Sequence, residues 1–195
     1  MLFLAKRDTK SSLIGAALMA LAAYAAYSAL DLSWPPPASV WHLVEDGLFG
    51  LAVLLASDVS LHTMFSSLAS DRYPSAFLGL AEVFAGQSPS DWLAGAVLAG
   101  GEDLLFRGVL VTGGIQVVGL GPIAAAALAA LAFGLAHLML ERRLWAFSIW
   151  AAWEGFLLGL LYLASGSLGA VILAHGLHDV LGFWFFHRSL ERAQP

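Results

Sequence analysis

The chain has 195 residues, of which 59% are hydrophobic and 12% are charged, and its mean hydropathy is +0.80. Soluble domains are usually about 45–50% apolar and about 25% charged, so this composition excludes an ordinary soluble domain and indicates a membrane protein. A net charge of −5 offers no basic face for nucleic acid, and the absence of cysteine excludes disulfides and thiolate metal sites. We expect one membrane domain over residues 1–195.

Hydropathy predicts six transmembrane helices, because each crossing needs roughly 20 apolar residues. Consecutive prolines after Trp34 end the first of them, and Ser88-Pro89-Ser90-Asp91 resembles the start of the third. The first apolar run is longer than the core of a signal peptide, usually about 7–15 residues, so we interpret it as a retained helix. The fold class is therefore all-α, a polytopic helical bundle. The spans are expected at about 11–30, 41–58, 92–113, 122–140, 144–163 and 168–187.

The positive charges predict the orientation of this bundle. Of nine Lys and Arg residues, only Arg107 lies inside a predicted span. With a cytoplasmic N-terminus, all the others fall on the cytoplasmic side, as the positive-inside rule requires. Both chain ends are then cytoplasmic, and the apolar segment near 76–87, too short to cross, is expected as an interfacial helix on that side. From the compact size we expect a bacterial inner (plasma) membrane.

Three short polar patterns interrupt the apolar spans. Carboxylates, arginine and histidine are costly at membrane depth, so their presence there indicates a function. Helical spacing directs the groups of each pattern to one helix face. The patterns are Glu102-Asp103-x-x-x-Arg107, Phe133-x-x-x-His137 and His175-x-x-x-Asp179.

These residue types suggest hydrolysis within the membrane. Asp103 and Arg107 are four residues apart and can pair on one helix face. Glu102 lies about 100° around the same helix, so it faces a different neighbour and is a candidate general base. Asp179 can orient the imidazole of His175, and the second pattern supplies another imidazole. Together these groups predict a site that deprotonates water for attack on a carbonyl group.

In this order and spacing, the patterns resemble the CPBP family, also called Abi, of CAAX-prenyl-protease and bacteriocin-processing intramembrane proteases. The runs 155–162 and 165–168 also match that family, and the resemblance covers roughly residues 90–187. It implies a glutamate-dependent endopeptidase that cuts near the C-terminus of membrane-attached proteins or peptides. Such substrates include prenylated tails and C-terminal sorting segments.

The resemblance also implies roles for individual residues. Glu102 and His137 correspond to the pair that activates the attacking water. His175 and Asp179 correspond to the pair that stabilises the oxyanion, and Arg107 would orient the carboxylates. The site is expected in the cytoplasmic half of the bilayer.

Two positions depart from the family pattern. Asp103 is one methylene shorter than the family's glutamate, so we expect a reduced reach toward the site. Asp179 stands where prenyl-protease members have asparagine, and an ionised aspartate would repel an oxyanion, so it must be protonated or act by orienting His175. We expect no obligatory cofactor. Zinc is the alternative, with the ligands Glu102, His137, His175 and Asp179.

Structural interpretations of the same residues stay open at this stage. Glu102 and Arg107 are alternatively a buried ion pair that ties helices together. His178 is interpreted as a helper or packing residue, and Gly155-x-x-x-Gly159 as a helix-packing notch. Residues expected to face water or the lipid interface are His42, Glu45, Asp46, Trp145, Trp150 and Trp153.

The alternative class of function is a non-catalytic membrane protein. Buried acids and histidines also form proton relays, so a proton-linked transporter or a chaperone for membrane segments is the competing hypothesis. The sequence argues against a transporter, because no repeated halves with broken helices are visible.

Overall fold

The structure is a computed structural model, and it describes residues 8–33, 39–68, 87–140 and 145–193. The regular structure in these ranges is helical, which confirms the all-α prediction. Except for Gln87, the predicted interfacial helix near 76–87 lies outside the described residues. The helices are α1 (Thr9–Leu30), α2 (Val40–Leu68), α4 (Pro89–Asp103), the π-helix η1 (Leu104–Val111), α5 (Thr112–Gln116), α6 (Pro122–Leu140), α7 (Trp145–Ser165) and α8 (Leu168–Ala193).

Five of the described helices, namely α1, α2, α6, α7 and α8, are long and apolar enough to cross a membrane. The remaining predicted span, 92–113, lies within the continuous helical stretch formed by α4, η1 and α5. Each of these three pieces is short on its own, and the change of helix type divides them. The six predicted spans therefore correspond to six helical rods, one of them with a π-helical middle.

Side-chain caps fix the beginnings of two rods. The carboxylate of Asp8 accepts a hydrogen bond from the Ser11 amide at the start of α1. Ser88 and Asp91 form a reciprocal capping box at the start of α4, with proline in the first turn, as the sequence indicated. Thr9 then donates a hydrogen bond of 2.7 Å from Oγ1 to Oδ1 of Asp91, which ties the start of α1 to the start of α4.

The π-helical segment begins directly after Asp103. The amide of Leu104 is shared between the carbonyls of Gly100 and Gly101, where the α-helical pattern changes. The hydroxyl of Tyr27 donates to the Gly108 carbonyl at 3.0 Å and so attaches the segment to α1. Short π-helical stretches inside α-helices occur frequently at functional sites, and this one carries Arg107.

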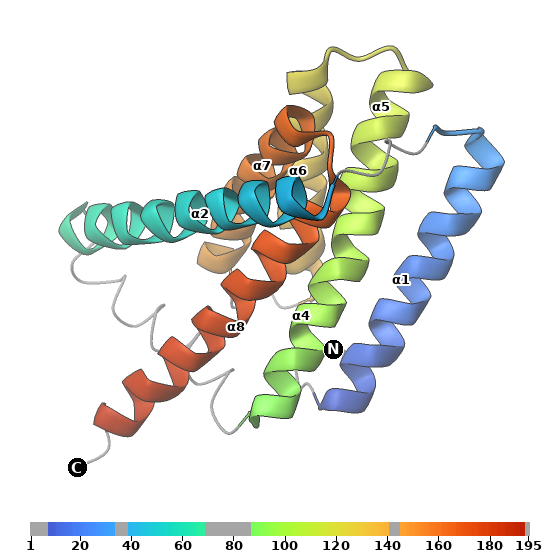
Figure 1. The fold of residues 1–195 in the computed structure, drawn as a ribbon. Helices are drawn as coiled ribbons and strands as arrows, with labels where there is room; N and C mark the ends of the chain where they lie inside the picture. The colour runs from blue at the N-terminus through green and yellow to red at the C-terminus, as the bar shows by residue number, and fades with distance from the viewer. Residues whose placement is uncertain (1–7, 34–38, 69–86, 141–144, 194–195) are drawn as a thin grey trace.

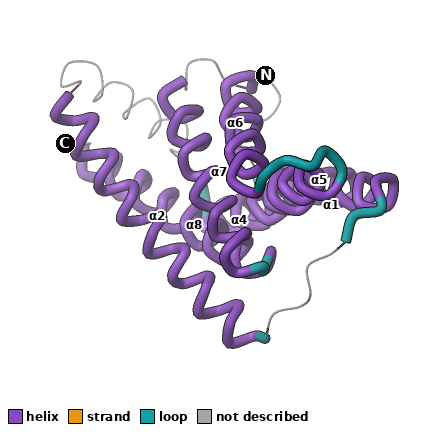
Figure 2. Tube along the Cα trace, turned by 90° about the horizontal axis from the view of Figure 1, so that it is seen from above, coloured by secondary structure: helices purple, strands orange, loops and turns teal. Residues whose placement is uncertain are grey.

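The helices form a bundle crossed by one oblique member (Figure 1). α1 runs along α4, α6 runs along α7, and α8 packs against both α4 and α2. α2 runs at a steep angle to α1 and α4 (Figure 1), and the view from above shows it along the outside of the bundle beside α8 (Figure 2). α8 is therefore the helix that joins the α1–α4 pair to α2.

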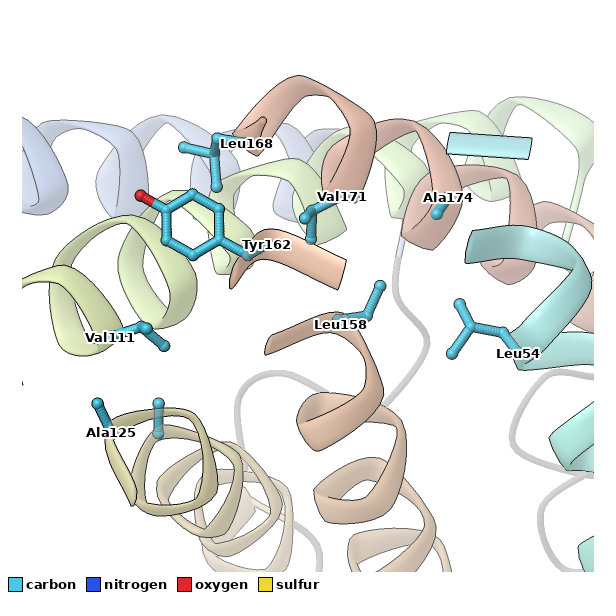
Figure 3. Close-up of a cluster of buried hydrophobic side chains, with 9 residues drawn as sticks. Leu54, Val111, Ala125, Leu158, Tyr162, Leu168, Val171 and Ala174 are labelled. Carbon is cyan, nitrogen blue, oxygen red and sulfur yellow. The ribbon is translucent and has the colours of Figure 1, made fainter. Parts of the chain in front are cut away.

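The largest apolar cluster lies where five elements meet (Figure 3). Leu54 of α2, Leu158 of α7 and Val171 of α8 are almost fully buried in it. Tyr162 extends the cluster toward α5, because its hydroxyl forms a hydrogen bond of 2.9 Å with Thr112 Oγ1. This cluster fixes α7 and α8, which carry several of the polar residues described below, against η1 and α6.

The pair Gly155 and Gly159 brings α7 close to α6. A Cβ at Gly159 would lie 3.1 Å from the Cβ of Ala126, and one at Gly155 would lie 3.4 Å from the Cα of Ala130. This confirms the interpretation of the spacing as a helix-packing notch.

Candidate active site

The first polar pattern forms a buried chain of charged groups. Arg107 Nη1 donates to Asp103 Oδ1 at 2.7 Å, and His175 Nδ1 lies 3.1 Å from the other carboxylate oxygen of Asp103. Asp103 is 0% exposed and Arg107 is 1% exposed. The pairing of Asp103 with Arg107 that the sequence predicted is confirmed, and the chain continues into α8.

The guanidinium of Arg107 is held on three sides. Besides its bond to Asp103, Nη2 donates to the Gly155 carbonyl of α7 at 3.2 Å. The centre of the guanidinium lies 4.7 Å above the ring of Phe133 on α6, in a cation–π contact. These contacts, which come from α4, α6 and α7, offset the free-energy cost of burying the cation.

Asp103 does more than the sequence suggested, and Asp179 contacts His175 less closely. We expected a reduced reach for Asp103 and an orienting role for Asp179. Instead Asp103 makes the hydrogen bond to His175, whereas Asp179 Oδ1 lies 3.8 Å from His175 Nε2, beyond hydrogen-bond distance. Asp103 reaches His175 because α4 and α8 pack closely together. A carboxylate at this position donates nothing, so Nδ1 of His175 carries a proton and Nε2 faces Asp179.

Glu102 is buried yet available. It is 9% exposed, and its carboxylate accepts no hydrogen bond from the described part of the chain. Glu102 precedes Phe106 by four residues, so the two share a face of their helix. Phe106 packs on Phe133 of α6 with ring centroids 5.0 Å apart, so this face is directed toward α6.

His137 approaches the same aromatic group from α6. Its Nδ1 lies 2.9 Å from the carbonyl of Phe133, which can only accept, so Nδ1 is the protonated nitrogen. In the neutral ring, Nε2 is then free to accept a proton or a hydrogen bond. No direct bond joins His137 to Glu102 among the described residues. His137 lies against the ring of Phe133, and Glu102 shares a helix face with Phe106, which packs on that ring.

Phe133 is the centre of this arrangement. Its ring lies 4.6 Å from the ring of His137 and 6.0 Å from that of His175, measured between centroids. It also carries the guanidinium of Arg107 on its face. Phe133 and Phe106 are both buried, and their packing shapes this part of the site.

A second polar cluster was not predicted. Asp58 of α2, Glu154 of α7 and His178 of α8 come together, with His178 Nε2 2.6 Å from Asp58 Oδ2 and 3.8 Å from Glu154 Oε1. Trp150, expected at the lipid interface, instead donates from its ring nitrogen to Asp58 Oδ1 at 2.8 Å. The signal that could have revealed this cluster is the acid Glu154 inside the predicted span 144–163.

The two polar groups differ in their ability to hold a metal ion. Among the described residues, the possible ligand atoms that lie within 4.8 Å of one another belong to Asp58, Glu154 and His178. The zinc ligands proposed as the alternative from the sequence do not form such a group of nearby ligand atoms. They are Glu102, His137, His175 and Asp179.

One comparison with known proteins found a match. Residues 86–181 match the family model described as type II CAAX prenyl endopeptidase Rce1-like. This match supports the CAAX-protease family that the resemblance of the motifs predicted. Comparisons with curated proteins and with solved structures gave no match.

Proposed function

We propose that this protein is an intramembrane endopeptidase that cleaves near the C-terminus of membrane-attached proteins or peptides, with water activated by Glu102 and His137. One observation carries the proposal. Asp103 is occupied on both oxygens by Arg107 and His175, whereas the adjacent Glu102 is buried without a hydrogen-bond partner in the described chain. We therefore assign to Asp103 the role of holding Arg107 and His175 in place, and to Glu102 the role of activating water.

The proposed chemistry uses two groups, the carboxylate of Glu102 and Nε2 of His137. Nε2 of His137 accepts a hydrogen bond that orients the water. Glu102 removes a proton from this water while the water oxygen bonds to the carbonyl carbon of the scissile amide. The tetrahedral intermediate then collapses, the C–N bond breaks, and Glu102 returns its proton to the leaving amine. The products are a new carboxylate and a free amine, with no change of redox state.

His175 stabilises the oxyanion that forms from the carbonyl oxygen of the scissile amide. In the protonated ring both nitrogens carry a proton, so Nδ1–H donates to Asp103 and Nε2–H can be donated to the oxyanion of the intermediate. Asp179 lies 3.8 Å from that nitrogen, and its side chain is 26% exposed. In this proposal Asp179 lies at the rim of the site and does not contact the oxyanion, whose charge it would repel.

An apolar groove supports a lipid-anchored substrate. The groove has a volume of about 410 Å³ and lies between α2 and α7, where apolar side chains such as Phe49, Val53 and Leu157 line it. Asp46 and Ser165 are its polar lining residues. Leu157 lies on α7 three residues beyond Glu154 and two beyond Gly155, whose carbonyl accepts from Arg107. A hydrocarbon chain in this groove would therefore extend along the helix that also contacts Arg107.

The proposal is tested with purified protein in liposomes. A peptide anchored at its C-terminal region by a prenyl group should be shortened, with the new C-terminus identified by mass spectrometry. The same peptide without a lipid anchor should be cut much more slowly. The competing hypotheses of a proton-linked transporter or a membrane-segment chaperone require no cleavage product. An absence of product with prenylated and helix-anchored peptides, together with proton-coupled uptake, would contradict the proposal.

Gly155→Ala is expected to reduce peptide cleavage by more than its effect on stability explains. A Cβ there would lie 3.2 Å from Arg107 Nη2 and 3.1 Å from Phe133 Cδ1, which forces the guanidinium to move. Overpacking of this kind costs about 1–3 kcal/mol of stability. Gly159→Ala is the matched control, because the three atoms nearest to its Cβ all belong to Ala126, the closest at 3.1 Å. Cleavage rates and thermal unfolding of both variants check this, and equal loss of cleavage in the two would refute it.

A further inference from the structure

The cluster of Asp58, Glu154 and His178 joins three helices far apart in the sequence. It lies outside the groups assigned to water activation, and its interpretation does not depend on their role. His178 is held through Nε2, since its other ring nitrogen is buried and has no hydrogen-bond partner. Trp150 occupies the outer oxygen of Asp58, which leaves Oδ2 directed at His178.

The charges of this cluster do not balance by themselves. Two carboxylates face one imidazole, so one negative charge remains uncompensated even when His178 is protonated. Glu154 is 9% exposed and accepts no hydrogen bond from the described residues, and its Oε1 points toward His178 at 3.8 Å. An uncompensated negative charge buried inside a membrane protein is costly, and a bound cation would remove that cost.

We propose that Asp58, Glu154 and His178 bind a divalent transition-metal ion, for which zinc is the probe. Imidazole nitrogen and carboxylate oxygen are both zinc ligands, bound at about 2.0–2.2 Å. Two ligands of one tetrahedral zinc ion are therefore about 3.3 Å apart, a value between the 2.6 Å and 3.8 Å found here. The bond from Trp150 to Asp58 is the outer contact that orients a metal-binding carboxylate.

The ion would stabilise the fold next to the proposed catalytic groups. It would connect α2, α7 and α8, and on α8 His178 is three residues from His175 and adjacent to Asp179. Binding would thus fix the rotation of α8 that brings His175 to Asp103. No step of the proposed cleavage reaction passes through the metal.

Zinc binding to the purified full-length protein tests this proposal. After chelator treatment and desalting, the wild type is expected to bind one zinc ion per chain by elemental analysis, and its thermal unfolding temperature should rise with zinc. Glu154→Gln should weaken zinc binding at least about tenfold and abolish the rise, because the glutamine carbonyl is a poor replacement for a carboxylate. Glu102→Gln should retain full binding.

Several outcomes would overturn the proposal. Loss of zinc in Glu102→Gln but not in Glu154→Gln would place the metal in the other polar group. No zinc bound by the wild type would mean that protons alone neutralise the cluster. If Glu154→Gln does not give a monodisperse helical protein, Asp58→Asn replaces it, and unchanged zinc binding in that folded variant would equally refute the assignment.

Discussion

Glu102→Gln is expected to lower the rate of peptide cleavage about 10²–10⁴-fold, the range that a general base contributes. Glutamine keeps the size and shape of the side chain but cannot take a proton from water. Its effect on folding should be small, because Glu102 makes no hydrogen bond or ion pair with the described residues. The measurement is the initial rate of product formation in liposomes, with thermal unfolding recorded on the same samples.

Glu45→Gln is the matched control for this substitution. Glu45 lies in α2 and is exposed, so the same chemical change there should leave the cleavage rate unaltered. Equal cleavage by wild type and Glu102→Gln would exclude Glu102 as the base. A large drop in the unfolding temperature of Glu102→Gln would instead indicate a structural role for Glu102, although its predicted ion pair with Arg107 is replaced by that of Asp103.

The helical bundle could be predicted from the sequence because its causes are local. Apolar runs of sufficient length give the spans, and the box formed by Ser88 and Asp91 marks the start of α4. The notch formed by Gly155 and Gly159 was also readable, since small residues four apart allow close helix approach. The cytoplasmic placement of the chain ends stays a prediction from the charge pattern.

The π-helical segment was not predicted. Its residues, from Leu104 to Val111, are apolar apart from Arg107, so no change of hydrophobic period marks the change of helix type. The change depends on how the carbonyls of Gly100 and Gly101 share one amide, and on contacts such as that of Tyr27 with Gly108. Tertiary packing of this kind has no signature in the local sequence.

The candidate site was predictable only within each helix. The four-residue spacing of Asp103 and Arg107 gave their pairing directly. The bond from Asp103 to His175 joins residues 72 positions apart, and spacing carries no information about such a contact. The same reasoning explains why Asp179 was assigned the role that Asp103 fills, because Asp179 is the acid on the helix of His175.

Asp103→Asn is expected to destabilise the protein by about 3–5 kcal/mol and to remove most cleavage activity. The substitution leaves Arg107 as a buried cation without its anion, which is the costly way to break a buried pair. It also replaces the carboxylate that accepts from His175 Nδ1, so the imidazole loses its fixed orientation. Equilibrium unfolding in mixed micelles and the cleavage rate in liposomes measure the two effects.

A double variant separates stability from catalysis at this position. Replacing a buried pair by apolar side chains of similar volume is often neutral or stabilising, so Asp103→Leu with Arg107→Met should recover much of the lost stability. Cleavage should remain low, because His175 still lacks its carboxylate. Asp103→Glu, which restores the family's residue, should retain both. If the double variant regained cleavage along with stability, the pair would be structural alone, and His175 would need no partner to act.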